Sequence, residues 1–167
     1  MKHVQFAVQD AELFLELELA NLLGPVFQLP FAYCTTNLLW DGLERPHQLA
    51  LEPYRTMGRL EVVDLSFQDQ LRAAKFEAQS NGLTLAECSV YQLAQANNCP
   101  MLALCNSLYS RSYIPPVLLY NMRWLMNQLV ARSCMSRTDA IATTKRLSRL
   151  NPRLRVQYTQ LEEDLQR

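Results

Sequence analysis

The segment 82–104 constrains the fold of this chain more than any other. After a glycine turn, Thr84 and Glu87 have the spacing of a capping box, in which a hydroxyl and a carboxylate satisfy the free amides at a helix start. Amphipathic periodicity predicts a helix over 85–95, and a compact apolar run predicts a buried strand over 101–104. A helix that leads into a buried strand is typical of open α/β sheets, whose sites lie at the strand ends.

Other segments continue this alternation of strand and helix. Strands are predicted over 3–8 and 60–65, and shorter extended segments over 27–33 and 112–114. Helical spacing and capping residues predict further helices over 11–23, 35–43, 49–57, 66–80, 107–111, 118–130, 136–151 and 157–167. The predicted caps are Thr35 or Thr36 for the helix over 35–43, Ser66 for that over 66–80 and Ser136 for that over 136–151.

Prolines are expected to set several boundaries. The pair Gly24-Pro25 predicts the end of the first helix. Pro30 argues against a central strand around it, because proline cannot donate to a sheet ladder. Pro46 is predicted to end or interrupt one helix, and Pro53 to kink or restart the next.

Strands separated by helices require right-handed crossovers and hence a parallel sheet. The predicted fold class is therefore α/β, a three-layer α/β/α arrangement with a central parallel sheet and a helical C-terminal third. With 167 residues the chain fits one domain, 1–167, divided into an α/β core over 1–114 and C-terminal helices over 115–167.

Charge is balanced over the whole chain, with 16 basic and 16 acidic residues, but it is unevenly distributed. Ten Lys and Arg residues follow Ser110, against four Asp and Glu residues. A basic C-terminal third is suited to contact phosphate, and a solvated helix surface explains the same bias. Both readings stay open at this point.

The cysteines and the apolar runs indicate the compartment. Five cysteines without CxxC spacing are typical of free thiols in a reducing cytoplasm. The N-terminus lacks the apolar core of a secretory signal, and no apolar run approaches membrane-spanning length. We therefore expect a cytoplasmic protein without a membrane partner.

Candidate site residues follow the predicted strands. Asp10 comes after the first strand, Glu87 lies in the first turn of the helix over 85–95, and Cys105 and Asn106 follow the strand over 101–104. Because parallel strands end at one edge of the sheet, these side chains could share one cleft. Clustered carboxylates at such an edge hold Mg²⁺ or Mn²⁺ for phosphodiester hydrolysis. Simpler alternatives are that Asp10 and Glu87 only cap helices and that Cys105 is a small buried residue.

The order of elements resembles the PIN-domain family, the small metal-dependent ribonucleases that include many toxins of toxin–antitoxin pairs. The matching segments are VQDA at 8–11, LTLAECSV at 83–90 and PMLALCNSLY at 100–109. The segment 117–154 is similar to the C-terminal helices of a bacterial PIN subgroup. The resemblance thus covers nearly the whole chain and implies the fold predicted above.

Active PIN proteins place four acidic residues around one or two divalent ions, and the resemblance implies where these fall here. The first is Asp10, and Glu87 stands where the family has a third acid, an Asp. The second position falls at Gly42, beside Asp41, and the fourth falls on Cys105, beside Asn106. The implied site is degenerate: Asp10 and Glu87 would bind Mg²⁺ or Mn²⁺ weakly, with Asp41 and Asn106 as secondary catalytic candidates.

Two functions follow from this resemblance. One is a module of nuclease ancestry with weak or no ribonuclease activity that binds RNA or protein. The other is an active Mg²⁺- or Mn²⁺-dependent ribonuclease toxin with a cognate antitoxin. A homodimer is also expected, because the family commonly dimerises and because a Met and Leu stripe over 118–130 is typical of a core or a dimer surface.

Overall fold

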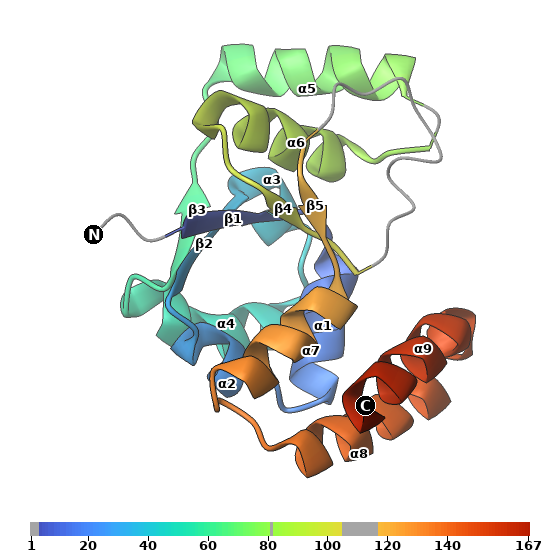
Figure 1. The fold of residues 1–167 in the computed structure, drawn as a ribbon. Helices are drawn as coiled ribbons and strands as arrows, with labels where there is room; N and C mark the ends of the chain where they lie inside the picture. The colour runs from blue at the N-terminus through green and yellow to red at the C-terminus, as the bar shows by residue number, and fades with distance from the viewer. Residues whose placement is uncertain (1–3, 81, 105–116) are drawn as a thin grey trace.

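The computed structural model describes residues 4–80, 82–104 and 117–167. In these residues five parallel strands form one sheet in the order β3-β2-β1-β4-β5 (Figure 1). The strands are β1 (Val4–Val8), β2 (Phe31–Thr36), β3 (Leu60–Val63), β4 (Met101–Leu102) and β5 (Leu119–Tyr120). The predicted α/β class with a central parallel sheet is thus confirmed.

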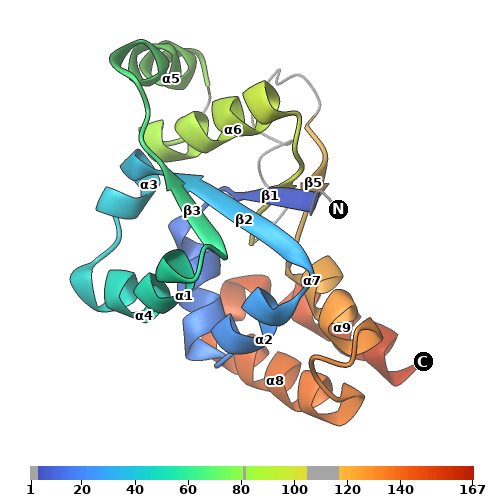
Figure 2. The ribbon, with the colours of Figure 1, turned by 90° about the vertical axis from the view of Figure 1, so that its left-hand side faces the viewer.

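Helices cover both faces of the sheet, as Figures 1 and 2 show, and complete the three layers. The helices α3, α5 and α6 lie on one side, and α1, α2, α4 and α7 lie on the other, with α8 and α9 packed beyond them. Their bounds are α1 (Ala11–Leu19), α2 (Leu23–Gln28), α3 (Asn37–Asp41), α4 (Arg45–Thr56), α5 (Phe67–Gln79), α6 (Leu85–Asn97), α7 (Met122–Ala131), α8 (Arg137–Leu150) and α9 (Arg155–Gln166). A short 3₁₀ helix, Pro152–Leu154, joins α8 to α9.

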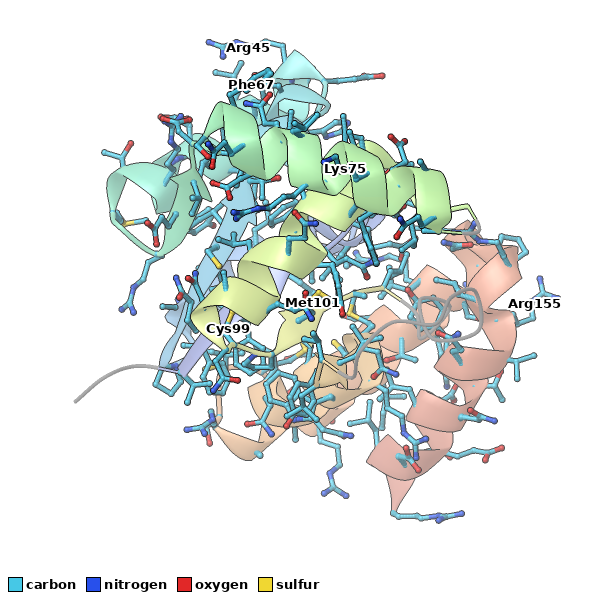
Figure 3. The ribbon with its side chains drawn as sticks, turned by 90° about the horizontal axis from the view of Figure 1, so that it is seen from above. Arg45, Phe67, Lys75, Cys99, Met101 and Arg155 are labelled. Atoms are coloured by element: carbon cyan, nitrogen blue, oxygen red, sulfur yellow. The ribbon has the colours of Figure 1, made fainter. Side chains whose placement is uncertain are left out.

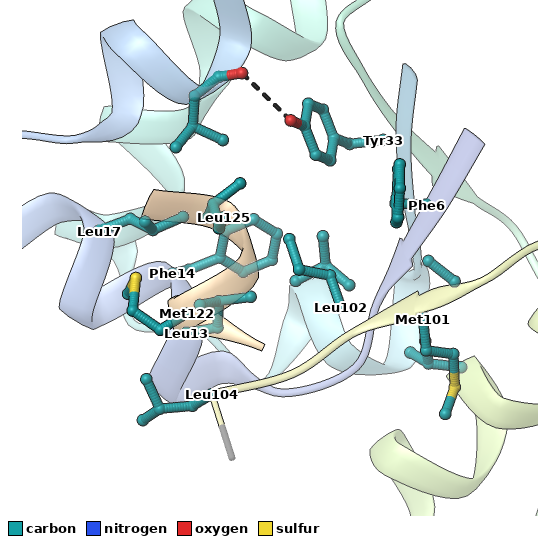
Figure 4. Packing of buried hydrophobic residues seen from close by; sticks show 14 of the residues in the cluster. Phe6, Leu13, Phe14, Leu17, Tyr33, Met101, Leu102, Leu104, Met122 and Leu125 are labelled. Atoms are coloured by element: carbon teal, nitrogen blue, oxygen red, sulfur yellow. Dashed lines mark hydrogen bonds between the residues drawn. The ribbon is translucent and has the colours of Figure 1, made fainter. Parts of the chain in front are cut away.

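The core lies between the sheet and the helices on either side of it. Phe6, Ala7 and Val8 are buried in succession, as expected for a strand of a parallel sheet that is covered on both faces. Figure 4 shows side chains of α1 and α7 packed against Leu102 of β4 and Leu104, which follows it. The Tyr33 hydroxyl donates to the carbonyl of Val26 at 3.1 Å, so β2 is fastened to α2.

The predicted capping residues begin the helices as expected. The hydroxyls of Thr36, Ser66, Thr84 and Ser136 accept from the backbone amide three residues later, at the starts of α3, α5, α6 and α8. Side-chain acceptors at these positions replace helical partners that the first amides lack. The sequence therefore located the starts of α5, α6 and α8 correctly, and for α3 the cap is Thr36 rather than the alternative Thr35.

Two of the proline predictions were wrong. Gly24 and Pro25 do not end a helix but lie in the first turn of α2, where the amide that proline lacks would have no helical partner. The preceding helix ends earlier, at Leu19. Pro30 lies just before β2, so it removes no ladder hydrogen bond, and β2 is paired on both sides, by β1 and β3.

The helix α4 corrects two further predictions. It begins at Arg45, so Pro46 lies in its first turn rather than ending a helix, and the helix runs on through Pro53 to Thr56. His47 also lies in this helix, and its Nδ1 is 2.6 Å from a carboxylate oxygen of Glu18 in α1.

The helix predicted over 118–130 begins later than expected. Leu119 and Tyr120 form β5, because their backbone pairs with β4 and this pairing overrides the local apolar spacing. Within α7, Leu125, Met126 and Leu129 are fully buried inside the chain. This part of the stripe belongs to the core, so it supplies no surface for a dimer. The segments predicted over 107–111 and 112–114 lie outside the described residues.

The two C-terminal helices are fastened to α1 through a buried carboxylate. Glu16 is 6% exposed and accepts from Asn151 Nδ2 and from the Tyr158 hydroxyl, both at 2.8 Å. Burial and the contact with Glu16 raise the pKa of Tyr158. The Arg146 guanidinium adds a 2.6 Å hydrogen bond to the carbonyl of Ala20. These contacts hold α8, α9 and the turn between them against the middle and the end of α1. Across the described ranges, no helix combines the length and the apolarity needed to span a membrane.

Candidate functional site at the carboxyl edge of the sheet

Asp10 lies where β1 ends and α1 begins. Its Oδ1 accepts from the amide of Leu13 at 2.7 Å, which caps α1, and its Oδ2 accepts from the amide of Leu104 at 3.1 Å. Leu104 follows β4, the direct neighbour of β1 in the sheet. The carboxylate therefore joins two strand ends, and the alternative that Asp10 caps a helix is confirmed.

Glu87 also takes part in a helix cap, at the start of α6. Its Oε2 accepts from the amide and from the hydroxyl of Thr84, at 2.7 and 3.0 Å, while that hydroxyl accepts from the amide of Glu87 at 3.2 Å. This is the complete capping box that the sequence predicted.

One cleft brings the two carboxylates together. It has a volume of about 470 Å³ and lies among the starts of α1 and α6, the end of α3 and the turn between α8 and α9. The expected sharing of one edge by the end of the first strand and the helix after Gly82 is therefore confirmed. The described residues that line it are Asp10, Ala11, Glu12, Leu39, Gly42, Thr84, Ala86, Glu87, Leu104 and Arg153.

The remaining predicted residues differ in their positions. Asp41 is exposed at the end of α3 and does not line the cleft, so its candidate role is not supported by its position. Its neighbour Gly42 does line the cleft. A Cβ built on Gly42 would stand 3.5 Å from the nearest backbone oxygens, an ordinary contact, so a side chain would fit there. Cys105 and Asn106 lie outside the described residues.

The protonation of Asp10 reflects its surroundings. Burial raises its pKa to about 6, against the lowering effect of the two amide hydrogen bonds. The negative charges of Glu12 and Glu87 add to the rise. The carboxyl of Asp10 therefore titrates at a higher pH than an ordinary aspartate.

These donors fit a Mg²⁺ or Mn²⁺ site poorly. Hard divalent cations are bound by several oxygen ligands that the protein leaves available. Here both oxygens of Asp10 and one oxygen of Glu87 already accept hydrogen bonds from backbone amides, and Gly42 supplies no donor side chain. In the described part of the chain, no group of three or more His, Cys, Asp or Glu side chains could hold a metal ion.

Sequence reasoning missed two charged residues of the cleft, Glu12 and Arg153. They form an ion pair with each other, and both side chains are largely exposed. Glu12 stands two residues after Asp10 and lies in the first turn of α1, which was a usable signal. Arg153 is more than 140 residues from Glu12 in the chain. Nothing local in the sequence indicates that contact. It depends on the hydrogen bonds from Asn151 and Tyr158 to Glu16, which bring the turn between α8 and α9 to α1.

The cysteines were expected to be free thiols, and the four that the structure describes, Cys34, Cys88, Cys99 and Cys134, are free. Cys34 and Cys99 lie in β2 and just before β4, on either side of β1, and their thiols are hydrogen-bonded to each other. This contact lowers the pKa of Cys99 to about 7 and, with burial, raises that of Cys34. The pair lies away from the cleft lining.

A second cavity, of about 450 Å³, lies between α5 and α6 at the end of β3. Its lining includes Asp64, Asp69, Ser89 and Gln92. It holds none of the predicted site residues, so the cleft at Asp10 is the candidate functional site.

Comparisons with known proteins identify no family for this chain. No protein-family model matches the sequence, and no curated protein matches it either. The resemblance to the PIN family therefore stays a prediction that rests on the sequence motifs.

Proposed function

We propose that this chain is a PIN-like domain of nuclease ancestry that binds RNA at the cleft and has weak or no ribonuclease activity. The observation that carries the proposal is the use of the two matching carboxylates as helix caps. Asp10 accepts hydrogen bonds from two backbone amides, and Glu87 forms the capping box of α6 with Thr84. Two carboxylates supply less negative charge than a two-metal hydrolytic site requires, and three of their four oxygens already accept hydrogen bonds.

An RNA partner is supported by the basic surface of the C-terminal helices, whereas the described lining of the cleft holds three acids, Asp10, Glu12 and Glu87, and one arginine. The C-terminal helices and the turn between them carry exposed arginines, among them Arg149, Arg153 and Arg155, and Arg153 lines the cleft itself. Guanidinium groups recognise phosphate by paired hydrogen bonds. Protein binding, a cognate antitoxin and a homodimer stay predictions, and the burial of most of the α7 stripe lends the homodimer no support.

The test combines RNA binding with RNA cleavage. Fluorescence anisotropy with a labelled RNA in EDTA should detect binding, and the same RNA with Mn²⁺ should be cleaved slowly or not at all. An absence of binding would overturn the RNA-binding proposal.

A gain-of-function variant tests whether the site is eroded. The substitution Gly42→Glu adds a carboxylate where a side chain fits, and we expect it to raise the affinity for Mn²⁺ about tenfold in titration calorimetry, because one more oxygen ligand and one more charge face the cation. Gly42→Gln has the same shape without the charge and should leave the affinity at the wild-type value. Equal affinities for the two variants would contradict the idea that a missing carboxylate limits metal binding.

The second candidate function is an active Mg²⁺- or Mn²⁺-dependent ribonuclease. The observation in its favour is that Asp10 and Glu87 line one cleft. Rapid cleavage by the wild-type chain that is lost in Asp10→Ala would establish this alternative. Cleavage that persists unchanged in Asp10→Ala would identify a contaminating nuclease.

A further inference from the structure

Two cysteine thiols meet across the strand β1, away from the cleft. Cys34 lies in β2, and Cys99 lies between the end of α6 and β4, where Figure 3 labels it. The register partner of Cys34 in β1 is Ala7, whose small side chain points to the same face of the sheet and leaves room there. On that face the thiols of Cys34 and Cys99 are hydrogen-bonded to each other.

The backbone geometry of this thiol pair does not suit a disulfide. Because β1 runs between the two chain segments, the Cα atoms of Cys34 and Cys99 stand about two strand spacings apart, roughly 9.6 Å. A disulfide requires Cα atoms within about 7 Å of each other. A sulfur–sulfur bond would therefore draw two strands together across a third one. Both cysteines are free thiols in the structure.

The same pair suits a single soft metal ion between the sulfurs. Thiolate sulfur is a soft donor, and two thiolates in a line satisfy Cu⁺. A structural Zn²⁺ ion takes four ligands. Among the residues that the structure describes, no group of three or more His, Cys, Asp or Glu side chains gathers to supply them. The type and the number of the donors therefore select Cu⁺.

The surroundings of Cys99 favour the deprotonated sulfur that a metal ion requires. The backbone amides of Ala7 and of Cys99 itself donate hydrogen bonds to this sulfur. Donors of this kind stabilise negative charge when the thiol proton leaves.

An ion can reach the pair from one side. Cys34 is completely buried and Cys99 is 8% exposed. Cys99 lines a cavity of about 370 Å³ together with Asn98, Pro100 and Leu118. The sulfur of Cys99 is therefore the first that an entering ion meets, and the sulfur of Cys34 lies behind it.

We propose that Cys34 and Cys99 form a two-coordinate site for Cu⁺. The ion replaces the thiol protons, which pass to solvent, so two Cu–S bonds form, two S–H bonds break, and no oxidant or reductant takes part. The site goes beyond the proposed RNA-binding function and does not depend on it, because neither cysteine lines the cleft.

The test is an anaerobic competition for Cu⁺ between the full chain and a chromogenic Cu⁺ chelator. The wild-type chain should withdraw about one Cu⁺ per chain, because two thiolates bind the ion more tightly than a single thiol does. Cys34→Ala and Cys99→Ala should each lose this binding. Cys88→Ala is the matched control, since Cys88 is also buried but its described hydrogen-bond partner is Ser80. It should bind Cu⁺ as the wild type does.

Two further measurements use the unmodified chain, in case a variant does not fold. X-ray absorption at the copper edge should show two sulfur neighbours. Alkylation with N-ethylmaleimide, mapped by peptide mass spectrometry, should become slower at Cys99 when Cu⁺ is bound and should stay unchanged at Cys134, which is partly exposed.

Several results would overturn the proposal. One is a wild-type chain that withdraws no Cu⁺ from the chelator. Another is a Cys34→Ala variant that keeps the ion, since Cys34 would then not be a ligand. Equal loss in Cys88→Ala would assign the effect to a disturbed core. A copper edge without two sulfur neighbours would contradict the site even if no variant folds.

Discussion

Asp10 and Glu16 are two carboxylates at the start and in the middle of the same helical segment, and the structure uses them in different ways. Each accepts two hydrogen bonds. The donors to Asp10 are the backbone amides of Leu13, in the first turn of α1, and of Leu104, just after β4, and its side chain lines an open cleft. The donors to Glu16 are side chains of the C-terminal segment, and Glu16 is buried.

The difference shows that two carboxylates on one segment can have separate roles, one in holding helices together and one in forming the cleft. A carboxylate between buried side-chain donors fastens the C-terminal helices, and its loss leaves polar groups without partners in the interior. A carboxylate between backbone amides at a strand end shapes the cleft and keeps contact with solvent. The first positions Arg153 at the cleft, and the second borders the space that Arg153 enters.

The largest effect is expected at the buried carboxylate. Glu16→Ala should lower the free energy of unfolding by about 3 to 5 kcal/mol, because the Tyr158 hydroxyl and the Asn151 amide lose their acceptor inside the protein. Urea unfolding followed by circular dichroism measures the change. Glu12→Ala, which removes an exposed acid of the same helix, should cost less than about 1 kcal/mol. Equal costs for the two variants would show that Glu16 does not fasten the helices.

The next effect is a pH dependence at Asp10. Its pKa is about 6 in the folded protein and 3.8 as the ordinary value, so between these pH values the folded state holds a proton that the unfolded chain releases. The contribution of Asp10 to stability is therefore complete below about pH 4, falls as the pH rises to about 6, and changes little above it. The loss is on the order of 2 kcal/mol, because one pKa unit corresponds to about 1.4 kcal/mol and partial exposure weakens the effect.

Unfolding experiments between pH 4 and 7 test this dependence. Asp10→Asn removes the titrating group, so its stability should lack the component that falls over this range in the wild type. Asp41→Asn, at an exposed residue outside the cleft, should keep the wild-type profile. A wild-type profile in Asp10→Asn would assign the pH dependence to other groups.

The smallest effect concerns the cap at the other side of the cleft. Thr84→Ala should cost about 1 kcal/mol, because the amide of Glu87 loses its side-chain acceptor. Glu87→Gln should lower the free energy of unfolding by only about 0.3 kcal/mol, since an amide oxygen can still accept a hydrogen bond from the Thr84 amide. Thermal unfolding of both variants measures the order. A larger cost for Glu87→Gln than for Thr84→Ala would mean that the charge of Glu87 does more than complete the cap.

Much of the scaffold could be predicted from short-range patterns. The capping hydroxyls of Thr36, Ser66, Thr84 and Ser136 begin helices as the sequence indicated, because a cap depends on residues only three positions apart. The predictions for Gly24-Pro25 and for Pro30 were wrong. Proline excludes a helix interior or a ladder position, but it does not say on which side of it an element begins.

By itself, the sequence determined the parallel α/β architecture and the approach of Asp10 to the helix that carries Glu87, because strands separated by helices must end at one edge. Only the tertiary structure decided the pKa of Asp10 and the presence of Glu12 and Arg153 in the same cleft. Those features depend on burial and on contacts between residues more than 90 positions apart, such as Asp10 with Leu104 and Glu16 with Tyr158. Local periodicity does not predict such contacts, because they form only when the helices pack on the sheet.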